Sequence, residues 1–144
     1  MPANTKPIFS KLGETSTNAT TGMSQLVTAA ANDYTGISAN NTLVFTADAT
    51  NGGFIQRLRF KAGGTNTASV ARIYINNGSA NTTATNNSFY GELSMPATTA
   101  TIVAATIDID YPMGIALPAG FRVYFGLGTA VAAGWVCTAI GGKY

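Results

Sequence analysis

Short segments in which apolar and polar residues alternate, each bounded by turn-forming residues, constrain the fold of this chain more than any other feature. In the segment Gly120–Leu127, every second residue from Phe121 onward is apolar, and Arg122 and Tyr124 stand between them. Successive side chains of a β-strand point to opposite faces of a sheet, so a period of two predicts a strand with one face in the core.

Similar segments recur through most of the chain, and glycine, asparagine or proline stands between them, as in Asn51-Gly52-Gly53 and Leu117-Pro118-Ala119-Gly120. These residues suit tight reversals of the backbone. No amphipathic helix of ten residues is predicted. The expected strands are Ser24–Ala30, Asn41–Ala47, Gly53–Lys61, Ala68–Asn76, Ser88–Met95, Thr101–Asp110, Met113–Leu117, Gly120–Leu127 and Gly134–Ile140. This number of strands in one small domain predicts an all-β fold, a two-sheet antiparallel sandwich with a jelly-roll-like topology.

The alternation also predicts which side of each strand faces the core. In Gly53–Lys61, one face is expected to hold Phe54, Gln56, Leu58 and Phe60, and the other Ile55, Arg57, Arg59 and Lys61. In Thr101–Asp110, the expected apolar face consists of Val103, Ala105, Ile107 and Ile109.

The chain divides into an N-terminal arm and one domain. Residues 1–22 are polar and contain two prolines, so we expect an extended arm, with the sandwich domain over residues 23–144. Ile8 and Phe9 are the apolar points of the arm. They indicate either anchors that dock on a neighbouring subunit or part of a frayed terminus. Neither an apolar signal-peptide segment nor a membrane-spanning stretch is apparent, so we expect a protein that stays or is assembled in a cytosol, without a membrane partner.

The composition removes the usual means of catalysis. The chain has no histidine, and half of its residues are Ala, Thr, Gly or Asn. Histidine is the commonest general base and metal ligand, so we expect no enzyme, no cofactor and no zinc. The single cysteine, Cys137, lies in an apolar run and is expected to be a small buried residue. Eight basic and six acidic residues give too little net charge to predict a nucleic-acid partner.

The acidic residues permit two further kinds of site, and neither is favoured. Asp108 and Asp110 share a strand face and could hold Ca²⁺, but no calcium-binding loop surrounds them. The alternative is that they face basic residues on a neighbouring strand. A glycosidase would need a paired carboxylate, and nothing in the sequence pairs Glu92 with a partner. The glycine pairs match turns rather than phosphate-binding loops.

Basic and aromatic residues at outward positions are the most specific polar feature. Arg57, Arg59, Lys61 and Arg72 are expected on two adjacent strands, with Tyr74 beside them, and Arg122 and Tyr124 repeat the pattern. Such a face is either an ordinary solvated surface or a protein interface, since arginine and tyrosine are enriched at interfaces. In the second case, these residues could meet Asp108 and Asp110 of a neighbouring subunit.

Three blocks of the chain resemble a known group of proteins. They are Leu43–Gly53, Ala71–Gly78 and Ile115–Tyr124, and the closing Gly134-Trp135 and Gly141-Gly142-Lys143-Tyr144 are similar in style. Together they span residues 41–144 and resemble small β-sandwich virion proteins of tailed bacteriophages. The resemblance implies a capsid decoration (cement) protein, often trimeric, on the outside of the phage head. It implies no catalytic residues, because its motifs are strand-and-turn patterns.

We therefore expect a structural virion protein that clamps neighbouring subunits of the major capsid protein. Its expected state is a homotrimer, and its expected place is the capsid surface, after assembly in the host cytoplasm. A tail, fibre or head-spike component is one alternative. A carbohydrate-binding module, with Tyr34, Tyr90 and Trp135 as exposed aromatic candidates, is another. An enzyme is the least favoured class.

Overall fold

The computed structural model describes residues 11–12 and 24–144, and in these residues the fold is built almost entirely of β-strands. The strands are β1 (Lys11–Leu12), β2 (Gln25–Val27), β3 (Thr42–Thr46), β4 (Gly53–Ala62), β5 (Ser69–Asn76), β6 (Asn87–Met95), β7 (Asp108–Leu117), β8 (Arg122–Leu127) and β9 (Trp135–Lys143). A 3₁₀ turn, η2 (Ala84–Asn86), precedes β6. The all-β prediction is confirmed.

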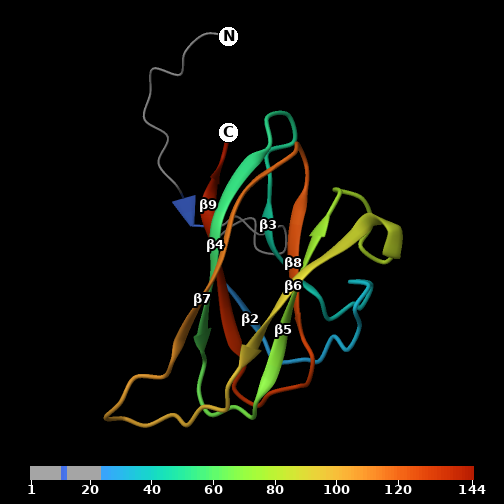
Figure 1. Ribbon diagram of the computed structural model, residues 1–144. Helices are drawn as coiled ribbons and strands as arrows, with labels where there is room; N and C mark the ends of the chain where they lie inside the picture. The colour runs from blue at the N-terminus through green and yellow to red at the C-terminus, as the bar shows by residue number, and fades with distance from the viewer. Residues whose placement is uncertain (1–10, 13–23) are drawn as a thin grey trace.

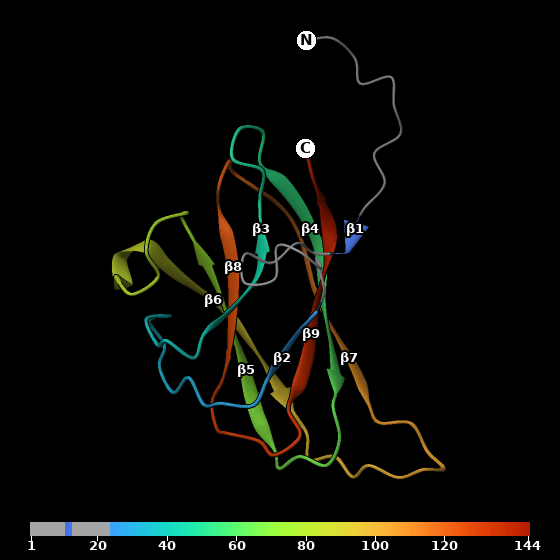
Figure 2. The same ribbon diagram turned by 180° about the vertical axis from the view of Figure 1, so that it is seen from behind.

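The strands form a two-sheet sandwich with jelly-roll topology (Figures 1 and 2). Sheet A has the order β1-β9-β4-β7, with β2 also paired to β9, and sheet B has the order β3-β8-β5-β6. The antiparallel pairs are nested: β2 with β9, β3 with β8, β4 with β7 and β5 with β6. Nested pairing of this kind is a long hairpin rolled up on itself, as the expected jelly roll requires.

The core lies between the two sheets. Phe60 of β4 and Phe125 of β8 meet edge to face across it, with ring centroids 5.3 Å apart, and both are fully buried. Trp135 is fully buried as well. Cys137 is buried, as expected, and burial raises the pKa of its thiol. Phe60, Phe125, Trp135 and Cys137 thus belong to one buried apolar core.

A β-bulge in β4 overturns part of the predicted alternation. The strand shifts register between Ile55 and Arg57 against both of its neighbours. Ile55 is fully buried, whereas Phe54 is 38% exposed and Gln56 is exposed. The prediction that Phe54 and Gln56 share the core face with Leu58 and Phe60 is therefore wrong. The bulge places two consecutive residues on the outer side, which reverses the alternation within one strand.

The predicted strand Thr101–Asp110 is also wrong in its first part. Strand β7 begins at Asp108, because its partner β4 pairs Lys61 with Asp108 and ends one residue later. The preceding residues have no strand to pair with and form a loop, in which Val103 is 88% exposed. From Asp108 to Leu117 the chain forms one strand, and Pro112 lies within it. Proline is tolerated there because β7 is the edge strand of sheet A.

Glycine is required in the turn between β3 and β4. Gly52 has a φ of 82°, and a Cβ at this position would lie 2.4 Å from the carbonyl oxygen of Leu117. The carboxylate of Asp48 accepts hydrogen bonds from the amides of Thr50 and Asn51, at 2.9 and 2.8 Å. The Asn/Gly turn predicted from the sequence is formed as expected.

Part of the N-terminal arm joins sheet A. Lys11 and Leu12 pair with Gly141 and Ile140 of β9, on the strand whose other half is paired with β2. Ile8 and Phe9, the predicted anchors, lie outside the described residues. Across the described ranges, the structure contains no helix with the length and apolarity needed to cross a lipid bilayer.

The bulge leads to a stability prediction. Phe60→Ala removes a ring from the centre of the core and should lower the free energy of unfolding by about 3–5 kcal/mol. Phe54→Ala, six residues earlier on the outer side, should cost less than about 1 kcal/mol. Equilibrium unfolding in urea measures both values. Equal losses for the two variants would show that β4 alternates without a bulge.

Candidate interaction surfaces

The outer face of sheet A carries a row of ion pairs between β4 and β7. The guanidinium of Arg59 lies 2.5 Å from the carboxylate of Asp108, and the ammonium of Lys61 lies 3.0 Å from it. Arg57 lies 3.5 Å from Asp110. The interpretation that these aspartates face basic residues on a neighbouring strand is confirmed. The carboxylates proposed to meet a neighbouring subunit are thus already paired within this chain.

The ion pairs shift the ionisation of their members. The hydrogen bond from Arg59, followed by that from Lys61, lowers the pKa of Asp108. The same hydrogen bond raises the pKa of Arg59. Both groups are solvent-exposed, so the row contributes little to stability and mainly fixes the outer face of sheet A.

Arg72 and Tyr74 do not belong to this row. They lie on β5 in sheet B, because consecutive strands β4 and β5 belong to opposite sheets of the jelly roll. The prediction that the basic residues occupy two adjacent strands is therefore wrong. Both side chains are also buried: Arg72 is 9% exposed and Tyr74 is fully buried. In the chain as described, they do not form an open contact face.

The loop between β2 and β3 covers Arg72 and Tyr74. The Tyr74 hydroxyl donates a hydrogen bond of 2.7 Å to the carbonyl of Asp33, and burial raises the pKa of Tyr74 to about 12. The guanidinium of Arg72 lies 4.0 Å from the centre of the Tyr34 ring and donates a 3.0 Å hydrogen bond to its hydroxyl. The Asp33 carboxylate accepts hydrogen bonds from the amides of Thr35, Gly36 and Ser38, which fixes the loop.

The remaining predicted contact residues lie on β8. Arg122 and Tyr124 are half-buried on the outer side of sheet B, and Tyr124 is paired with Tyr74 in the β5–β8 register. Of the three aromatic candidates for sugar binding, Tyr34 is 58% exposed and Tyr90 is 38% exposed. Trp135 is fully buried, so its proposed role as an exposed platform is wrong.

The loop between β6 and β7 projects from one end of the sandwich (Figures 1 and 2). Residues 96–107 contain no charged side chain. At the tip, Ile102 is fully exposed and Val103 is 88% exposed. The hydroxyl of Thr101 accepts a 2.9 Å hydrogen bond from the amide of Ala104, which closes the tip into a turn.

Asn66 holds the base of this loop. Its backbone amide and carbonyl pair with Thr98, at 3.0 and 2.9 Å. Its side chain accepts hydrogen bonds from the amides of Ala133 and Gly134 and donates one to the carbonyl of Gly134. One buried asparagine thus ties the β4–β5, β6–β7 and β8–β9 loops together at one end of the sandwich. The sequence prediction missed Asn66, because an asparagine beside a glycine pair also fits a simple turn.

No group of three or more Cys, Asp or Glu side chains that could hold a metal ion occurs in residues 11–12 and 24–144.

In comparisons with protein-family models, with curated proteins and with solved structures, the chain has no match.

The lowered pKa of Asp108 predicts a specific dependence of stability on pH. A carboxyl whose folded pKa lies below its unfolded value of about 3.9 stabilises the fold above that pH. This contribution disappears as the pH falls through the folded pKa. Asp108→Asn should therefore lose less stability than the parent between about pH 5 and pH 2, as measured by urea midpoints across this range.

Asp110→Asn is the matched control, because the ion pair of Asp110 with Arg57 is longer, at 3.5 Å. It should retain more of the parent's acid sensitivity than Asp108→Asn does. If Asp108→Asn follows the parent curve at every pH, the ion pairs of Asp108 do not contribute to stability.

Proposed function

We propose that this protein is a structural virion component, a decoration protein that binds the outside of a phage capsid and holds neighbouring capsid subunits together. The proposal rests on the resemblance of residues 41–144 to small phage virion proteins and on the jelly roll, a fold that also builds viral capsid domains. A fold shared by many functions cannot carry this proposal alone. The surface of the protein must supply a means of docking.

The tip of the β6–β7 loop is the observation that carries the proposal. Ile102 and Val103 are exposed on a loop that Asn66 and Thr101 hold in place. Among the described residues these are the two most exposed large apolar side chains, and their position on a fixed, uncharged protrusion favours a docking element. Burying each side chain in a partner would contribute about 1.5–3 kcal/mol.

The physical benefit to a capsid follows from linkage. A protein that binds the assembled shell, and not its separated subunits, stabilises the shell by mass action. Docking at several points adds to this effect, because each bound contact raises the effective concentration of the next. The loop tip, the N-terminal arm with Ile8 and Phe9, and a homotrimeric state would together provide such points.

Replacing the tip tests the docking element. Ile102→Ser combined with Val103→Ser should weaken binding to the major capsid lattice by about two orders of magnitude, because two buried apolar contacts are lost. Both side chains are exposed, so the free energy of unfolding should change by less than about 0.5 kcal/mol. Binding is measured by co-sedimentation with heads of the phage that encodes this chain, prepared without the protein.

Phe54→Ser is the matched control, since Phe54 is an exposed apolar residue at the far end of β4, away from the loop. It should bind the heads as the parent does. Full binding by the double variant would exclude the tip as the docking element. Failure of the parent to bind heads, or a copy number far below that of the capsid subunits, would exclude decoration itself.

Deleting residues 1–12 tests the arm separately. The deletion removes Ile8 and Phe9 and the pairing of Lys11 and Leu12 with β9. We expect weaker attachment to heads and a shift of the light-scattering mass from trimer toward monomer. A matched variant, Ile8→Ser with Phe9→Ser, retains the length of the arm and Lys11–Leu12. Unchanged attachment of both variants would show that the arm is not a contact element.

A further inference from the structure

Arg72 is the one buried cation of sheet B whose hydrogen bonds are incomplete in the described part of the chain. It lies on β5, an inner strand of sheet B, and is 9% exposed. Its Nη2 donates to the Tyr34 hydroxyl at 3.0 Å, and its Nε lies 3.6 Å from the carboxylate of Glu92. Within the described residues, Nε and Nη1 have no hydrogen-bond acceptor.

This arrangement leaves a buried positive charge undercompensated. A buried guanidinium normally donates most of its five hydrogen bonds, and leaving them unmade is costly. Glu92 is half exposed to solvent and is too far from Nε for a hydrogen bond. The other nearby carboxylate, that of Asp33, is occupied by backbone amides of its own loop. An anionic ligand beside the guanidinium would compensate this charge.

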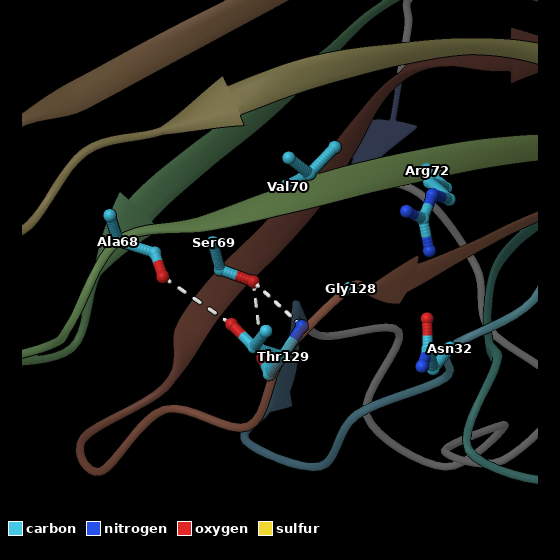
Figure 3. Close-up of a pocket in the computed structure, with 7 residues that line it drawn as sticks. All are labelled: Asn32, Ala68, Ser69, Val70, Arg72, Gly128 and Thr129. Atoms are coloured by element: carbon cyan, nitrogen blue, oxygen red, sulfur yellow. Dashed lines mark hydrogen bonds between the residues drawn. The ribbon is translucent and has the colours of Figure 1, made fainter.

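An open pocket of about 430 Å³ lies beside the guanidinium (Figure 3). Ser69 and Val70 of β5 form one side, Gly128 and Thr129 after β8 form another, and Asn32 faces Arg72 from the β2–β3 loop. Gly128 leaves the space next to the guanidinium unfilled. A Cβ there would lie 3.6 Å from both Nη1 and Nη2.

The rim of the pocket is polar and held in place. The Ser69 hydroxyl donates to the carbonyl of Thr129 and accepts from its amide, both at 3.1 Å. The Thr129 hydroxyl donates to the carbonyl of Ala68 at 3.3 Å, so its lone pairs can accept from a ligand hydroxyl. The Asn32 side chain is exposed and can both donate and accept.

We propose that this pocket binds an acidic monosaccharide unit, a pyranose ring that carries a carboxylate, as in a uronic acid. The carboxylate lies beside the guanidinium of Arg72 where this residue lines the pocket, the ring hydroxyls meet Asn32 and Thr129, and the apolar side of the ring packs on Val70. The volume fits one sugar ring with its substituents. A peptide strand is disfavoured, because the pocket lies over the inner strands β5 and β8, where no sheet edge is free for backbone pairing.

The proposal goes beyond capsid decoration and is compatible with it. In both opposite views, the β6–β7 tip projects to one side of the molecule, and the β2–β3 loop that borders the pocket lies on the other side (Figures 1 and 2). A protein docked through the tip would leave the pocket accessible.

Titration of the full chain with methyl glucuronide, followed by amide NMR shifts, tests the site. We expect saturable shifts at residues 68–72 and 128–129 and no saturable shifts with methyl glucoside, which lacks the carboxylate. Arg72→Gln should weaken binding by about tenfold or more. Arg122→Gln, which removes a positive charge on the same sheet outside the pocket, should bind as the parent does.

Because Arg72→Gln could also loosen the loop above it, Gly128→Leu provides a second variant that keeps the charge and fills the pocket. It should abolish binding while the amide spectrum stays folded. Undiminished binding by both variants would overturn the proposal, as would the absence of glucuronide binding. Equal binding of acetate, or saturable binding of an acidic peptide in place of the sugar, would exclude a sugar site.

Discussion

The β-bulge at Gln56 is the feature on which the rest of the sandwich depends. Strand β4 lies between β9 and β7 and contributes Ile55 before the bulge and Leu58 and Phe60 after it to the core. These positions have opposite parity, so no uninterrupted strand could bury all three. By turning the successive side chains of Gln56 and Arg57 outward, the bulge lets one strand bury three of its four large apolar residues, while Phe54 stays on the outer side.

The same bulge sets the pattern of charge on sheet A. Downstream of it, every outward residue of β4 is basic, and the register with β7 brings these residues against Asp108 and Asp110. The ion pairs are exposed and weak, and they pair three cations with two carboxylates, so the row keeps one net positive charge. The docking element proposed above is instead the apolar tip of the β6–β7 loop, with Ile102 and Val103.

The strands were predictable and their sheet assignment was not. Alternation located most strands to within a few residues, because it is a local consequence of one buried face. The bulge gave no local signal, since Phe54, Gln56, Leu58 and Phe60 repeat with the same period as an unbroken strand. Residues 101–107 also alternate, but they remain a loop because β4 ends before it can pair with them. Pairing between distant strands decided both cases.

For the candidate sites too, local sequence predicts the direction of a side chain, whereas contacts with distant segments decide its burial. The outward direction of Arg72 follows from its parity on β5, but its burial depends on a loop some 40 residues earlier that Asp33 folds through an aspartate turn. Asn66 joins three loops at the end of the sandwich that carries both the pocket and the apolar tip. The undercompensated charge of Arg72 and the exposed apolar tip thus lie at the same end of the sandwich and face different sides of it. Asn66 fixes the base of the tip, whereas the hydrogen bonds between Ser69 and Thr129 fix the rim of the pocket. Both proposed contact sites are therefore ordered in the free protein, so binding at either would require little further ordering of the chain.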